Sequence, residues 1–80
     1  MVTMKNIRLV DNQIWMDCYK EGKEEGYFSL VVDSRAYEIV SCSLERPSIY
    51  ARQAAAKIAE LCKENAELPT EAKSVLVLIA

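Results

Sequence analysis

The chain has 80 residues and a formal net charge of −2 at pH 7; 51% of its residues are hydrophobic and 28% are charged. This length predicts one domain, residues 1–80, with a small core, and the apolar content argues against an intrinsically disordered chain. A pI near 5.1 sets the chain apart from strongly basic nucleic-acid-binding domains. The absence of histidine removes the commonest general base and metal ligand.

Two segments of alternating polarity open the chain, Lys5–Val10 and Gln13–Tyr19, and the dipeptide Asp11-Asn12 separates them. Asp and Asn tolerate the positive φ that a two-residue type I′ turn requires, so this pattern predicts a β-hairpin. The pairs that follow from this loop are Val10 with Gln13, Leu9 with Ile14, Arg8 with Trp15, and Ile7 with Met16.

A polar connection, Lys20–Gly26, leads to two further predicted strands, Tyr27–Asp33 and Tyr37–Leu44. The loop between them can hold residues 34–35 or 34–36. The three-residue loop separates apolar from polar side chains better, so we favour it. Its register pairs Leu30 with Val40, Ser29 with Ser41, and Phe28 with Cys42.

One face of this predicted sheet is apolar. It carries Ile7, Leu9, Ile14, Met16, Cys18, Phe28, Leu30, Val32, Val40, Cys42 and Leu44. The alanine-rich segment Pro47–Asn65 predicts a helix that covers this face, with Pro47 in its first turn or Ser48 as its N-cap. The residues at helical spacing that would contact the sheet are Ala51, Ala54, Ala55, Ile58, Leu61 and Cys62.

The tail, residues 73–80, is apolar to its last position. We predict a strand, because two valines and an isoleucine fall within seven residues; a helix starting at Thr70 is the alternative. The predicted fold is therefore α+β: a four-stranded antiparallel meander with one helix on one face and the tail as a candidate fifth strand. That strand would join the sheet of its own chain or of a second copy.

The second sheet face is rich in aromatic residues and is the candidate binding surface. Its predicted contact residues are Arg8, Trp15, Tyr19, Tyr27, Tyr37 and Ile39, with Val31 beside them. Such a face suits a protein partner or a homodimer contact. Alternatively, the aromatic rings only shield a solvated face, or they stack unpaired bases with help from Arg8, Lys20, Arg35 and Arg52.

Catalytic and metal-binding chemistry has little support in the sequence. Cys18, Cys42 and Cys62 can converge in the core, where we expect small buried hydrophobic residues rather than a thiol or metal site. The carboxylates of Asp17, Asp33, Glu38 and Glu45 lack a predicted cleft, and no phosphate-binding glycine motif is present. We therefore predict no enzyme activity, no cofactor and no metal.

The segment Gln53–Leu61 resembles the last helix of double-stranded-RNA-binding domains, which also follows an antiparallel sheet. That family has a preceding helix and a lysine cluster where its last helix begins. Here residues 47–52 supply one basic residue, Arg52, so the phosphate-binding element is missing and the family is not assigned.

Location follows from three sequence features. No apolar run reaches the length of a membrane span, and residues 1–10 lack the apolar core of a secretory signal. Three widely spaced cysteines argue against a disulfide framework. We expect a cytoplasmic, non-enzymatic interaction module that binds a protein partner or itself through the aromatic face and the apolar tail, with single-stranded nucleic acid as the alternative ligand.

Overall fold

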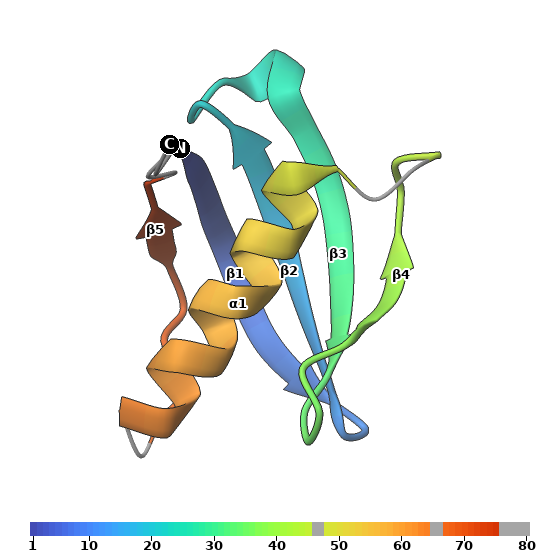
Figure 1. Ribbon diagram of the computed structural model, residues 1–80, viewed down its shortest axis with the longest axis vertical. Helices are drawn as coiled ribbons and strands as arrows, with labels where there is room; N and C mark the ends of the chain where they lie inside the picture. Colours follow the sequence, from blue (N-terminus) through green and yellow to red (C-terminus); the bar gives the residue numbers. More distant parts are fainter. Residues whose placement is uncertain (46–47, 65–66, 76–80) are drawn as a thin grey trace, which may run out of the picture.

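The computed structural model describes residues 1–45, 48–64 and 67–75. Over these residues the chain forms a five-stranded antiparallel sheet in the order β4-β3-β2-β1-β5, and one helix, α1, lies diagonally across one face (Figure 1). The elements are β1 (Val2–Val10), β2 (Gln13–Lys20), the 3-10 turn η1 (Glu24–Gly26), β3 (Tyr27–Asp33), β4 (Ile39–Cys42), α1 (Ile49–Glu64) and β5 (Ala72–Ser74). The predicted α+β fold is confirmed, with β5 as the fifth strand.

The hairpin between β1 and β2 forms as the sequence predicts. Asp11 and Asn12 have φ angles of 47° and 66°, the left-handed values that a type I′ turn needs. The pairs from Val10–Gln13 back to Arg8–Trp15 are those expected from the two-residue loop. Turn chemistry and hydrophobic alternation agree here, and this agreement fixes the register.

The predicted regular pairing does not continue past Arg8, because β1 contains a bulge between Lys5 and Arg8 that sets both Asn6 and Ile7 against Met16. Asn6 occupies the bulge with φ 53°, and Lys5 pairs with Asp17. An extra residue in one strand reverses the alternation of side chains beyond it. The strand also begins earlier than predicted, at Val2 instead of Lys5.

This reversal explains the burial pattern of β1. Val2 and Met4, before the bulge, are fully buried, and Ile7, after it, is also buried. Even-numbered residues of β1 thus face α1 before the bulge, and odd-numbered residues face it after the bulge. Leu9 pairs with the buried Ile14 yet is 62% exposed, because it lies at the open end of the layer, beside a hollow that Leu68 also lines.

The predicted register of the β3–β4 pair is also wrong. Leu30 pairs with Cys42 rather than Val40, and an irregularity follows before Val32 pairs with Ile39. The connection spans residues 34–38 and is closed by the Asp33 N–H, which donates to the Glu38 carbonyl at 2.9 Å. The Asp33 carboxylate accepts the backbone N–H groups of residues 35 and 36, and such side-chain capping supports a longer loop than the alternation suggests.

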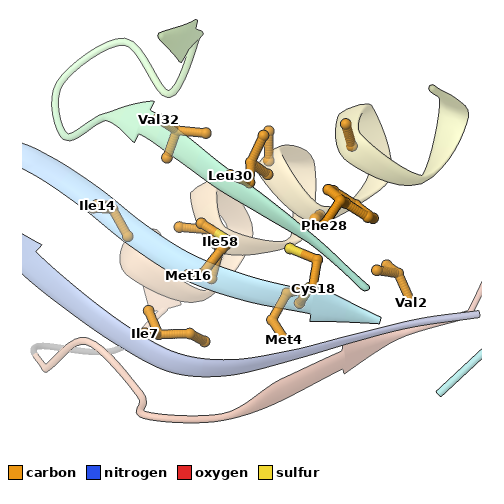
Figure 2. Packing of buried hydrophobic residues seen from close by; sticks show 13 residues of the cluster. Val2, Met4, Ile7, Ile14, Met16, Cys18, Phe28, Leu30, Val32 and Ile58 are labelled. Carbon is orange, nitrogen blue, oxygen red and sulfur yellow. The ribbon is translucent and has the colours of Figure 1, made fainter. Parts of the chain in front are cut away.

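The core lies between α1 and the sheet, as Figure 2 shows. Its buried members are Val2, Met4, Ile7, Ile14, Met16, Cys18, Phe28, Leu30, Val32, Ala51, Ala54, Ala55 and Ile58. Three alanines let the helix approach the strands closely, and Ile58 projects between Met16 and the side chains of β3. Of the remaining predicted core residues, Cys42, Leu44 and Cys62 pack at the margin, and Val40 is 52% exposed.

The ends of α1 and β5 complete the layer. Ser48 acts as the N-cap, since its hydroxyl accepts the Ala51 N–H at 3.4 Å. The predictions for Pro47 and Asn65 lie outside the described residues.

β5 pairs antiparallel with Val2–Met4, so the tail strand joins the sheet of its own chain, and the helix alternative fails over Ala72–Ser74. Residues 76–80 of the predicted strand lie outside the described residues. Within the described ranges, α1 is too short and too polar to cross a membrane.

Candidate interaction surface

The sheet face opposite α1 is called the outer face here. Its central part consists of Arg8 on β1, Trp15, Asp17 and Tyr19 on β2, Tyr27 and Val31 on β3, and Val40 on β4. Cross-strand pairing aligns these residues in rows: Arg8 with Trp15 and Val31, and Tyr19 with Tyr27. No described helix covers this face (Figure 1).

The predicted contact residues do not all share this face. Arg8, Trp15, Tyr19 and Tyr27 do, because their register was predicted correctly or follows directly from the hairpin. Ile39 pairs with the core residue Val32 and packs against the core from the helix side.

Tyr37 also packs against the core, in the loop before β4 with φ 58°. The irregularity in β4 exchanges the faces of two neighbours, so Val40 takes the outer position expected for Ile39. A shift of one residue turns each side chain to the other face.

Arg8 is held over Trp15. Its guanidinium carbon lies 5.8 Å from the centroid of the indole ring, and Nη1 donates to the Asn6 carbonyl at 2.8 Å. The bulge therefore supplies the acceptor that orients this cation. Trp15 remains 39% exposed, so one aromatic surface and most of the guanidinium donors are open to a ligand.

Asp17 is the centre of a polar network on the same face. One carboxylate oxygen accepts the Asn6 amide at 2.9 Å, and the other accepts the Tyr27 hydroxyl at 3.1 Å. The hydrogen bond to this carboxylate, more than the partial loss of solvent, raises the pKa of Tyr27 above its usual value. Tyr27 also packs against Tyr19 with ring centroids 5.5 Å apart, and the Lys5 ammonium lies 5.6 Å from the Tyr19 ring.

A depression of about 180 Å³ opens between these groups. Trp15, Val31 and Val40 give it apolar walls, and Arg8 and Asp17 border it. Pockets for drug-sized ligands usually measure about 300–1,000 Å³, so this hollow has the size of a single side chain.

Two other hollows carry less specific chemistry. A hollow of about 530 Å³ beside the start of β1 mixes Lys5 and Lys73 with Glu21 and Glu71. Glu21 accepts the Met1 amino group at 3.0 Å, and mainly this bond lowers the pKa of its carboxyl group. Opposite charges of similar number give this hollow no clear ligand preference.

The third hollow, of about 240 Å³, lies on the helix side between Leu9, Ile14, Tyr37, Cys62 and Leu68. Loss of solvent around the hydroxyl raises the pKa of Tyr37, and a hydrogen bond with Cys62 adds to this shift. This hollow is a gap at the end of the core, where α1 and the β1–β2 hairpin diverge.

The candidate carboxylates do not form an acid–base pair on this surface. Asp17 has the two hydrogen bonds described above, and Asp33 caps its own loop. Glu38 and Glu45 are exposed. Within residues 1–45, 48–64 and 67–75, no three cysteine or carboxylate side chains gather in a way that could hold a metal ion.

The three cysteines are free and differ in burial. Cys18 is fully buried, and this burial, with smaller effects from Cys42 and Asp17, raises the pKa of its thiol to about 12. Only the thiolate reacts with alkylating reagents, and at pH 8 a thiol of this pKa is ionised in roughly one molecule in ten thousand.

We therefore expect pulsed iodoacetamide to label half-buried Cys42 and Cys62 in the native protein, and Cys18 only when urea unfolds it. Mass spectrometry of peptides from native and unfolded samples measures the order in which the three cysteines are labelled. Equal labelling rates at all three thiols under native conditions would contradict this burial.

Two outer-face residues, Asn6 and Val40, were missed by sequence reasoning. For Asn6 a signal exists: apolar residues occupy even positions at Val2 and Met4 and odd positions at Ile7, and such a change of parity indicates a bulge. Val40 gives no comparable signal, because it stands in an unbroken apolar pair with Ile39.

Comparison with known proteins gives no relative to which a function can be traced. No protein-family model, no curated protein and no solved structure matches this chain. The geometry of the outer face is thus the ground for a functional proposal.

Proposed function

We propose that this chain is a small, non-enzymatic interaction module that binds a protein partner through the outer face of its sheet. One observation carries the proposal: Arg8, Trp15, Val31 and Val40 line an open depression of mixed apolar and polar character on a sheet face that α1 does not cover. Trp, Tyr and Arg dominate the binding energy of protein interfaces, particularly around pockets that lose water on binding.

The proposed contact residues no longer include Tyr37 and Ile39, which the sequence predicted, and now include Val40. Arg8, Trp15, Tyr19 and Tyr27 remain. The apolar tail remains a proposed second contact, since Val75, directly after β5, is 70% exposed. We also propose a cytoplasmic location, which the three free cysteines would suit because that compartment is reducing.

A nucleic-acid ligand is less well supported. Asp17 lies in the middle of the outer face, where its charge would repel a phosphate backbone. The basic residues that would assist Arg8 lie elsewhere: the Lys20 ammonium is 6.0 Å from the Tyr50 ring of α1, and Arg52 is an exposed residue of α1 itself.

Trp15→Ala should remove most partner binding. A side chain of this kind contributes about 2 kcal/mol or more at an interface centre, which is roughly a thirtyfold loss of affinity. The measurement is quantitative affinity purification from the cells that make this protein, followed by titration of the purified partner.

Ile49→Ala is the matched control, since Ile49 is 52% exposed but lies on α1. If Trp15→Ala and Ile49→Ala retain the same partners at the same affinity, the outer face is not the binding surface.

A further inference from the structure

The outer face contains groups that are complementary to one another, both in charge and in shape. A two-fold symmetric interface uses the same patch on both subunits, so the patch must be complementary to itself. Here an exposed cation, Arg8, and a carboxylate, Asp17, border the same depression. The exposed apolar side chains of Trp15 and Val40 also lie beside this depression.

Both charged groups have unused hydrogen-bonding capacity. A guanidinium has five N–H donors, and Arg8 uses one of them on the Asn6 carbonyl. Among the described residues, no carboxylate lies within ion-pair distance of Arg8. A carboxylate offers about four acceptor positions, and Asp17 uses two, on Asn6 and Tyr27.

The positions of Arg8 and Asp17 allow an ion pair between each residue and the other residue of a second copy. Arg8 pairs with Trp15 across the strands, and Asp17 follows Trp15 by two residues along β2. An axis in the plane of the face, midway between Arg8 and Asp17, brings each of these residues opposite the other in the second copy. Such an axis passes near Trp15, which places the largest exposed aromatic side chain at the centre of the interface.

The apolar part of the patch is also complementary to itself. Val40 is 52% exposed and Trp15 is 39% exposed, whereas Val31, 8% exposed, forms the floor of the depression. The hollow of about 180 Å³ has room for one side chain of this kind. Both kinds of complementarity therefore occur within one patch.

We infer that the partner of the outer face is a second copy of this chain. The two copies bind face to face about a two-fold axis that brings Arg8 of each copy opposite Asp17 of the other. This inference rests on the proposed function and names the partner. The three central strands have 9, 8 and 7 residues and the two edge strands, β4 and β5, only 4 and 3, so the outer face is small for a stable interface. We therefore expect a weak association.

A charge exchange between two variants tests the inference. Arg8→Glu and Asp17→Lys each place like charges at both ion pairs of a homodimer, so each variant alone should associate at least about tenfold more weakly than the native chain. In an equimolar mixture the introduced carboxylate meets the introduced ammonium, and native Arg8 meets native Asp17. The mixture should therefore recover dimers, measured by sedimentation velocity from about 10 μM to 1 mM.

Matched controls carry the same charge changes on exposed positions of α1: Arg52→Glu and Glu64→Lys should associate like the native chain. Because Asp17→Lys also removes the bonds to Asn6 and Tyr27, circular dichroism must show that it folds. Val40→Asp leaves that network intact and should also give monomers, so it tests the same face if Asp17→Lys unfolds.

Three results would overturn the inference: a native chain that is monomeric up to about 1 mM, dimers that persist in Val40→Asp, or a mixture of folded charge variants that stays monomeric while the native chain dimerises. The proposed function can survive these results. If the native chain is monomeric but Trp15→Ala still loses a different purified protein, the outer face binds that protein and not a second copy.

Discussion

Phe28→Ala should cost about 3–5 kcal/mol of the free energy of unfolding, the range observed when a buried aromatic ring is removed from a core. Among the described residues, Phe28 is the largest fully buried side chain, and it lies on β3 opposite Cys18. A domain of this size has only a few kcal/mol of net stability, so most molecules of this variant should be unfolded. Loss of the circular dichroism signal and of the urea unfolding transition measures the effect.

Tyr27→Ala is the control for this prediction, because Tyr27 precedes Phe28 but points to the outer face. Tyr27 is 50% exposed, and its loss removes one hydrogen bond to Asp17 and the contact with Tyr19. We expect a cost of about 1 kcal/mol. If Tyr27→Ala destabilised the protein as much as Phe28→Ala does, the assignment of the two faces of β3 would be wrong.

Gly26→Ala should destabilise the chain by about 2–3 kcal/mol, because the site has no room for a methyl group. A Cβ atom there would lie 2.8 Å from both Cβ and the carbonyl oxygen of Lys20, and 2.9 Å from its nitrogen. Two of these atoms belong to the backbone at the end of β2, so relief requires a shift of the strand. Urea unfolding followed by Trp15 fluorescence measures the loss.

Gly22 provides the comparison within the same connection. Its φ is 70°, and a Cβ atom there would lie 3.2 Å from Met1 Cε and 3.6 Å from the Thr3 hydroxyl. The Met1 methyl group can move, so Gly22→Ala should cost about 1 kcal/mol through its left-handed backbone. Gly22→Asn should recover part of that, since Asn tolerates this conformation. A larger cost at Gly22 than at Gly26 would contradict the close approach to Lys20.

The sequence was sufficient where local chemistry and long-range pattern agree. The Asp11-Asn12 turn demands positive φ at both positions, and the alternation on either side independently requires the same register. The bounds of β3 are likewise those predicted, Tyr27–Asp33, because polar and turn-forming residues stand on both sides. The alanine stripe of α1 predicted its buried face, including Ala51, Ala54, Ala55 and Ile58.

The sequence was insufficient where one residue is inserted into a strand. The bulge at Asn6 and the irregularity in β4 each reverse which side chains face α1, and alternation alone assumes that no reversal occurs. The Asp33 carboxylate lengthens its loop through hydrogen bonds that no hydrophobic pattern records. The sheet face was therefore predicted correctly for Arg8 and Trp15, whose register comes from the turn, and wrongly for Tyr37 and Ile39, which pack against the core. The role of these residues in binding stays a prediction.

The pairing of β5 with Val2–Met4 also has a consequence for the order in which the chain is made. A ribosome synthesises Val2 some seventy residues before Ser74, so the N-terminal strand leaves the exit tunnel long before its edge partner exists. The hairpins from β1 to β4 can form during translation, but one edge of Val2–Met4 stays open until Ala72–Ser74 emerges. A released chain truncated after Glu71 should therefore be more accessible to proteases at this edge than the full chain, because Val2–Met4 then lacks its partner strand.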